Sequence, residues 1–166
     1  TVNVTGSTTE ATKGYDEVTS ANFDSSKKYL ILSDNAKTLL NTNDTDSVVA
    51  GAGTGTGLKL SGGLSADSTQ LWTITGSGST YTIRNANGQY LQIEKNKSSV
   101  NSSSSDLTLD YNNGTWTIAG AGDYYLNNFG GAGKIAAGWK DDAAAGDVGS
   151  QWTIYEITST DAEKST

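Results

Sequence analysis

The sequence predicts an all-β fold, and two observations lead to this prediction. Short segments in which apolar and polar residues alternate recur along the chain, as strands with a period of two require. These segments are residues 29–32, 58–60, 71–74, 81–83, 90–93, 107–109, 116–118, 124–126 and 152–157. Clusters of Gly, Asn, Asp or Ser separate most of them, and no longer window has the apolar spacing of an amphipathic helix.

The length of the chain suits one domain. It has 166 residues, of which 20 are glycines, and a hydrophobic fraction of 34% that includes 4 tryptophans is enough to build a core. Residues 1–14 and 159–166 are polar and rich in Ser and Thr, so we expect two linkers around a domain of residues 15–158. The start at Thr1 and the absence of Met suggest a piece cut from a longer precursor.

Composition excludes several classes of function. With no Cys and no His, the chain lacks disulfides, thiol nucleophiles, the commonest general base and the usual zinc ligands. A net charge of -7, with Arg84 the sole arginine, opposes binding to nucleic acid and to anionic membranes. No apolar run approaches the roughly 18 residues of a membrane span. We therefore expect neither nucleic acid nor a membrane as a partner, and we expect no cofactor.

An internal repeat is the most informative feature. Segments 29–39, 81–91 and 116–126 align without gaps. Each begins with an aromatic residue, has Ile two residues later, passes through a polar turn and reaches Leu ten residues after the aromatic residue. Two strands joined by a turn explain this pattern, because alternation puts the aromatic residue, Ile and Leu in one core.

Two further apolar elements follow each of these hairpins, so the sequence predicts three pseudo-repeats of four strands, at about 27–75, 79–111 and 114–157. The first repeat is longer, and we assign the excess to a loop insertion at residues 51–57. Three units that cannot bury their own faces favour a closed threefold arrangement, the β-trefoil. We also expect strand 15–18 to pair with 154–157.

The fourth strands carry the mark of a known family. Gln70-Leu-Trp72 matches its Gln-x-Trp motif, Gln151-Trp152 is a shifted version, and Asp106-Leu107 has neither residue. Over residues 15–158 the sequence resembles the ricin-B-type β-trefoil lectins and the related carbohydrate-binding modules of secreted bacterial glycosidases.

The resemblance implies one sugar pocket per repeat, made by a carboxylate on the second strand, a stacking aromatic at the end of the third, and an amide-bearing residue before the fourth. In repeat three Trp139 has the aromatic position, Asn127 replaces the carboxylate, and further polar groups follow at Asn128, Asp141 and Asp142. Repeats one and two have no aromatic at the matching positions, which the alignment puts at Leu40 and Leu60 in repeat one, and at Gln92 and residues 100–101 in repeat two.

The aromatic residues have competing interpretations. We expect Trp72, Trp116 and Trp152 to be core residues, because they occupy repeated strand positions. Trp139 stacks on a sugar, packs the following loop, or contacts a partner protein. Tyr124, which would point away from the core, and Phe129 in a turn each form a second wall of the pocket or are ordinary surface aromatics.

The pair Asp141-Asp142 has three interpretations: catalytic carboxylates, a calcium site, or a solvated loop. Adjacent carboxylates diverge on an extended chain, so a glycosidase pair would need a second acid from elsewhere. Calcium needs more oxygen ligands than this segment concentrates, and we therefore expect no metal site.

The function expected is a non-catalytic carbohydrate-binding module that tethers a secreted or cell-surface multimodular enzyme to glycans. Its partners would be a glycan or polysaccharide and the catalytic domain of its parent chain, and the module itself would be a monomer. The alternative is a structural or protein-interaction trefoil of an adhesin or surface protease with decayed sugar pockets. An independent enzyme is less expected, because its chemistry would depend on carboxylates alone.

Overall fold

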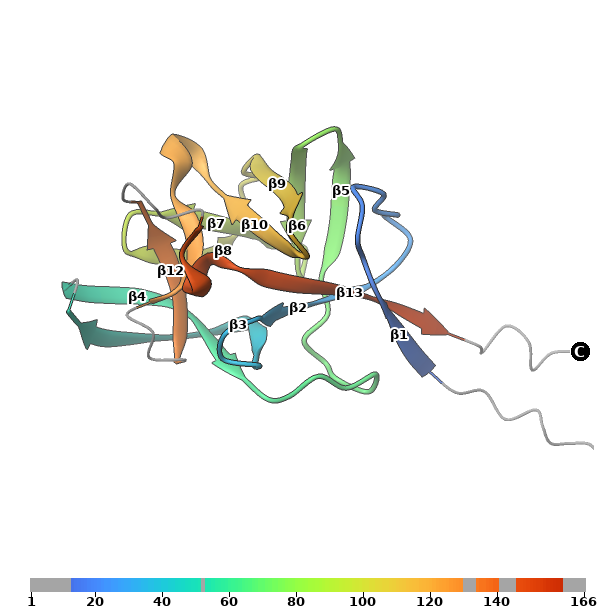
Figure 1. The fold of residues 1–166 in the computed structure, drawn as a ribbon, viewed down its shortest axis with the longest axis horizontal. Helices are drawn as coiled ribbons and strands as arrows, with labels where there is room; N and C mark the ends of the chain where they lie inside the picture. The colour runs from blue at the N-terminus through green and yellow to red at the C-terminus, as the bar shows by residue number, and fades with distance from the viewer. Residues whose placement is uncertain (1–12, 52, 130–133, 141–145, 160–166) are drawn as a thin grey trace, which may run out of the picture.

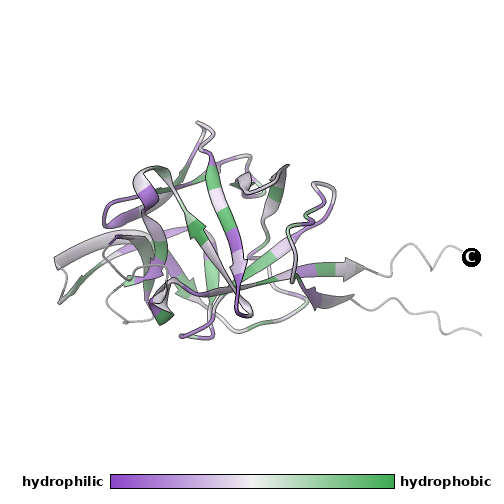
Figure 2. Cartoon of the chain, turned by 45° about the horizontal axis from the view of Figure 1, so that its top comes forward, coloured by the Kyte–Doolittle hydropathy of each residue, from purple (hydrophilic) through white to green (hydrophobic). Residues whose placement is uncertain are grey.

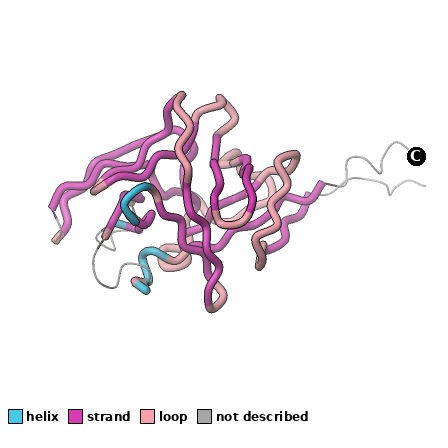
Figure 3. Tube along the Cα trace, turned by 90° about the horizontal axis from the view of Figure 1, so that it is seen from above, coloured by secondary structure: helices cyan, strands magenta, loops and turns pink. Residues whose placement is uncertain are grey.

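The computed structural model describes residues 13–51, 53–129, 134–140 and 146–159. Strands dominate this part of the chain, with two short 3-10 helices, η2 and η5 (Figure 3). In chain order the elements are β1 (Lys13–Glu17), β2 (Tyr29–Ser33), β3 (Leu39–Ala50), β4 (Gly53–Ser61), β5 (Thr73–Ser77), β6 (Thr80–Arg84), β7 (Tyr90–Glu94), β8 (Lys97–Asn101), β9 (Leu107–Asn112), β10 (Thr115–Ala119), η2 (Ala121–Asp123), β11 (Tyr125–Asn128), β12 (Ile135–Trp139), η5 (Val148–Ser150) and β13 (Trp152–Ser159).

The first and fourth strands of the three repeats close a barrel (Figure 1). Its strands follow one another in the order β2, β5, β6, β9, β10 and β13, and β13 returns to β2. The ring closes between β2 and β5 through Tyr29 and Trp72, whose backbone N–H groups each donate to the other's carbonyl at 2.8 Å.

The same pairing recurs in every repeat, which confirms the β-trefoil prediction. Tyr29 pairs with Trp72, Tyr81 with Leu107, and Trp116 with Trp152, so the leading aromatic of each repeat meets the fourth strand at one equivalent point. All three tryptophans in these pairs are fully buried, as predicted.

Each barrel strand supplies two core residues, one of which, Trp72, lies directly before β5. These are Tyr29, Ile31, Trp72, Ile74, Tyr81, Ile83, Leu107, Leu109, Trp116, Ile118, Trp152 and Ile154. Each pair is spaced by two residues, because period-two alternation turns every second side chain inward. Figure 2 shows hydrophobic segments gathered on the strands in the middle of the molecule.

Burial also affects one ionisable core residue, Tyr29. Its hydroxyl accepts a hydrogen bond from the backbone N–H of Asp24 at 2.7 Å and donates to Glu156 Oε1 at 3.2 Å. The pKa of Tyr29 is raised to about 12, mainly by burial; the nearby charge of Glu156 acts in the same direction, and the hydrogen bond with the backbone of Asp24 opposes the shift.

Three hairpins, β3–β4, β7–β8 and β11–β12, cap one end of the barrel and approach one another closely. A Cβ atom added to Gly57 would lie 1.8 Å from the carbonyl oxygen of Ala136, and one added to Gly138 would lie 1.9 Å from that of Glu94. Only glycine therefore fits at these two contacts between hairpins.

Two predictions about repeat one are wrong. The residues assigned to a loop insertion, 51–57, belong largely to β4, and the extra length forms a long hairpin arm, β3–β4, beyond a register shift between Leu40 and Thr45. The turn before β3 is also one residue longer than in the other repeats, with Lys37 at a φ of 57°. As a result Leu40, not Leu39, joins Leu91 and Leu126 in the main core.

Leu39 instead belongs to a second apolar cluster beside the barrel. It packs with Leu30 and Leu32 from the outward face of β2, and with partly buried residues that include Leu64 and Leu71 of the β4–β5 loop. Both faces of β2 are therefore buried.

The predicted pairing of the two ends of the domain is confirmed. β1 runs antiparallel to β13, with Tyr15 opposite Ile157 and Lys13 opposite Ser159 (Figure 1). The paired strands thus reach two residues before and one residue beyond the predicted domain limits, and the rest of both predicted linkers lies outside the described residues. Among the described residues, no helix has the length and hydropathy needed to cross a bilayer.

Candidate functional site

The predicted site lies on the β11–β12 hairpin of repeat three. Tyr125 pairs with Trp139 and Asn127 with Ala137, so these four side chains share one face of the hairpin. Leu126 faces the other way, into the main core. The candidate site is therefore on the outer face of this hairpin.

Trp139 is held at the end of β12 with its indole partly exposed. The ring lies edge-on to Phe129, with 6.4 Å between centroids and 81° between planes. It packs against the cluster of Phe129, Ile135 and Ala137, to which Val48 and Ala50 of the β3–β4 arm also pack. The arm of repeat one thus helps to support the aromatic residue of repeat three.

The structure corrects the position of Phe129. It is neither a surface aromatic nor a pocket wall, because its side chain is fully buried. The arm approaches so closely that a Cβ atom on Gly55 would lie 2.8 Å from the Phe129 ring. The sequence did not indicate this contact, since it depends on the arm, which we had expected to be a loop.

Asn127 is also corrected, from a ligand residue to a structural clamp. Its side chain is 4% exposed, and its Nδ2 donates to Asp147 Oδ2 at 3.0 Å and to Ser150 Oγ at 2.9 Å. A side-chain amide has two N–H donors, so both are used inside the protein. The clamp ties β11 to the segment that leads into β13.

An amide occupies the same position in all three repeats, directly after the core leucine of the second strand. In repeat one Asn41 Oδ1 accepts from the backbone N–H groups of Asn43 and Asp44 at 3.0 and 2.8 Å. In repeat two Gln92 Nε2 donates to Asn101 Oδ1 at 3.0 Å. The position that the sequence resemblance had assigned to a sugar-binding carboxylate thus carries amides that make internal hydrogen bonds here.

The register also corrects the positions compared with Trp139. Because Trp139 lies opposite Tyr125, its counterparts are Ser61, opposite Leu39, and Asn101, opposite Tyr90. The predicted match of Leu60 with Trp139 is wrong, because Leu60 is a buried core residue. The predicted match of Leu40 with Asn127 is also wrong, because Leu40 is in the core and Asn41 is the counterpart of Asn127. Neither counterpart is aromatic, so the difference between repeat three and the others remains.

The prediction that Tyr124 points away from the core is wrong. It packs against the main core on the side opposite Tyr125, and Lys140 Nζ lies 5.3 Å from its ring centroid. The structure therefore brings Tyr124 together with Lys140 and places it away from the face that carries Trp139.

The remaining predicted residues differ in position. Asn128 is almost completely buried, which removes it from the surface. Asp141 and Asp142 lie outside the described residues. Within the described residues, no three His, Cys, Asp or Glu side chains come close enough together to hold a metal ion.

Two residues of this face, Tyr125 and Asp147, were missing from the predicted site. Tyr125 is partly exposed directly opposite Trp139. Asp147, also partly exposed, caps η5 by accepting from Gly149 N at 3.4 Å and binds Asn127. An Asp followed by a short helical turn is a common cap, and this signal in the sequence could have identified Asp147.

Comparison with known proteins shows the fold. A designed threefold-symmetric protein, ThreeFoil, matches with a TM-score of 0.59 and 14% identity, over 76% of this chain and 96% of that protein. A salivary protein from Culex quiquefasciatus, of the Cysteine and Tryptophan-Rich (CWRC) family, matches with a TM-score of 0.50 and 19% identity, over 81% of this chain and 96% of that protein. No family model matches the chain, and no curated protein matches it by sequence.

Proposed function

We propose that this domain is a non-catalytic carbohydrate-binding β-trefoil of the ricin-B type, with one sugar site on the outer face of the β11–β12 hairpin. Trp139 would stack on one face of a sugar ring, and Tyr125 would contact the neighbouring part of the same ligand. The domain would hold a secreted or surface-attached parent enzyme on a glycan or polysaccharide.

One observation supports this proposal above the others: Trp139 is partly exposed and fixed at the same time. Its packing on Phe129 and on the arm orients the indole before any ligand arrives. An aromatic side chain that is already ordered loses little conformational entropy on binding, so more of its contact energy contributes to affinity. A mobile surface aromatic would lack this advantage.

Asp147 supplies the polar group that the site would otherwise lack. Asn127 and Gly149 hold its carboxylate on the segment that leads into β13. A carboxylate accepts strong hydrogen bonds from hydroxyl groups, and Asp147 would orient a sugar that stacks on Trp139. Asp147 would thus take over the role that the family assigns to the second strand.

Affinity electrophoresis against a panel of polysaccharides tests the proposal. A single shallow site predicts dissociation constants of roughly 0.1–1 mM, with retention on polymers raised by the parent enzyme. Trp139→Ala should abolish retention. Tyr15→Ala is the control, because it removes an exposed aromatic from β1, outside the proposed site, and it should leave retention unchanged. Equal retention of Trp139→Ala and the unmodified domain would refute the site.

A protein-interaction or structural trefoil is the second candidate, and a specific observation favours it. Each repeat uses its second-strand amide for internal hydrogen bonds, which is the outcome expected if the sugar pockets have decayed. The absence of retention on every glycan in the panel, by a folded domain, would decide for this candidate.

A further inference from the structure

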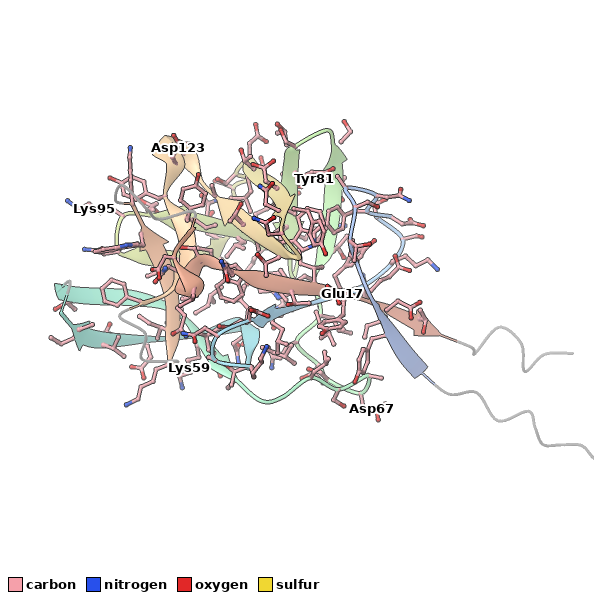
Figure 4. The ribbon with its side chains drawn as sticks, viewed as in Figure 1. Glu17, Lys59, Asp67, Tyr81, Lys95 and Asp123 are labelled. Carbon is pink, nitrogen blue, oxygen red and sulfur yellow. The ribbon has the colours of Figure 1, made fainter. Side chains whose placement is uncertain are left out.

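A cavity of about 280 Å³ lies between repeats one and two, and nothing in the proposed sugar site uses it. It is bounded by the β4–β5 loop, by the start of β5, by the residue before β2 and by the β6–β7 turn. The residues that matter for its chemistry are Lys28, Asp67, Thr69, Leu71, Thr73 and Ala86. Figure 4 labels Asp67 on the β4–β5 loop.

Hydrogen bonds to a single residue, Thr42, order both walls of this cavity. Asn85, which is 5% exposed, holds the β6–β7 turn by donating to the carbonyl of Thr42 at 2.8 Å. Gln70 Oε1, at the end of the loop, accepts from the backbone N–H of Thr42 at 2.8 Å. Ser68 Oγ in turn accepts from the N–H of Gln70 at 3.1 Å. The cavity is therefore largely preformed.

Lys28 is fixed at the edge of the cavity. Its Nζ donates to Thr73 Oγ1 at 3.0 Å, and Thr73 is 5% exposed. An ammonium group has three N–H donors, so two remain for a ligand. Among the described residues the only ion pair within 4.0 Å joins Lys37 and Asp34, so neither Lys28 nor Asp67 is neutralised by a partner there.

These groups together define the class of ligand. One ammonium and one carboxylate balance in charge, which favours a neutral ligand over an anion or a cation. Thr69 and Thr73 add hydroxyls, which pair well with other hydroxyls because each both donates and accepts. Leu71 and Ala86 add an apolar patch for C–H groups, and the volume is at the small end of ligand pockets. We propose that this cavity binds a single neutral sugar ring.

This site shares no lining residue with the hairpin of Trp139, so either site can fail alone. NMR titration of the isotope-labelled chain with D-galactose, D-mannose and N-acetyl-D-glucosamine should produce saturable shifts of the amide signals of Leu71, Thr73 and Ala86. Trp139→Ala should leave these shifts unchanged, whereas it should abolish polysaccharide retention.

Variants identify the groups that bind. Lys28→Met should lower the affinity measured in the titration about tenfold, because it removes a charged hydrogen-bond donor. Lys27→Met is the matched control, since Lys27 is adjacent in the chain but does not line the cavity, and it should have no effect. Asp67→Asn keeps an acceptor oxygen but removes its charge, and it should weaken binding in the same way if the sugar bonds to the charged carboxylate.

Three results would overturn the proposal. The first is the absence of saturable shifts at these amides with all three sugars. The second is a response to glycine or to sulfate alone, which would assign the cavity to charged ligands. The third is equal affinity of the Lys28→Met and Lys27→Met variants, because Lys28 would then make no contact with the sugar.

Discussion

Gly138 lies where β12 meets the β7–β8 hairpin, and its replacement by alanine should separate these two parts of the cap. The added Cβ would lie 1.9 Å from the carbonyl oxygen of Glu94, and ordinary contacts begin at 3.4 Å, so the hairpins would have to move apart by about 1.5 Å. The hydrogen bond from Asn96 N to the Gly138 carbonyl, now 2.8 Å, would be lost in the process.

The cost follows from these contacts. Overpacking of this kind costs about 2–3 kcal/mol, and the lost hydrogen bond adds about 1 kcal/mol. Alanine also lowers the conformational entropy of the unfolded chain relative to glycine, which offsets this cost by about 0.7 kcal/mol. We therefore expect Gly138→Ala to lower the free energy of unfolding by about 3 kcal/mol and Tm by roughly 6–12 °C.

Urea denaturation followed by tryptophan fluorescence measures this difference. Gly63→Ala is the matched control, because a Cβ at that position meets nothing within 4 Å, and it should change the free energy of unfolding by less than about 0.5 kcal/mol. If the two variants unfold at the same urea concentration, the close approach of the hairpins does not contribute to stability as we have argued.

Three further predictions concern buried polar groups. Burial raises the pKa of Tyr29 to about 12, so its phenol loses its proton at a higher pH in the folded than in the unfolded state. Its contribution to the free energy of unfolding should therefore be complete below about pH 10 and be lost as the pH rises toward 12. Tyr29→Phe should flatten this loss in a pH series of urea melts. Trp152→Phe should cost about 1 kcal/mol more than Trp72→Phe in the same assay, because Trp152 Nε1 donates to a β11 carbonyl at 2.8 Å whereas the buried Nε1 of Trp72 has no partner among the described residues; equal costs would contradict this. Asn127→Ala should cost about 1–3 kcal/mol, because it leaves buried Ser150 without its amide donor, and crystal or NMR data showing an unchanged loop before β13 would argue against the clamp.

The fold was predictable from the sequence because its repeated signal is spaced along the chain. The leading aromatic residue, the Ile two positions later and the fourth-strand pair recur in each repeat, and the structure places them at equivalent points of the barrel. Tyr29, Tyr81 and Trp116 fill one layer because alternation alone determines which way they point. No contact distant in sequence was needed for that inference.

The candidate site was less predictable, because its details depend on contacts between repeats and on single-residue shifts. The turn near Lys37 has one extra residue, so Leu40 and not Leu39 lies in the core. For the same reason Asn41, and not Leu40, is the counterpart of Asn127 in repeat one. Alternation could not decide between Tyr124 and Tyr125, since either register is consistent with two adjacent tyrosines. The burial of Phe129 requires an arm from repeat one, which local sequence does not reveal.

The pairing of β1 with β13 determines how the domain would respond to tension. Lys13 faces Ser159 at the outer end of this ladder, so a pull transmitted through the chain on both sides would open the strand pair like a zipper, one residue pair after another. A shear geometry would load all the hydrogen bonds of the ladder simultaneously and resist far more strongly. We therefore expect stretching in an optical trap to peel β1 away at low force, while the barrel and its three hairpins remain intact.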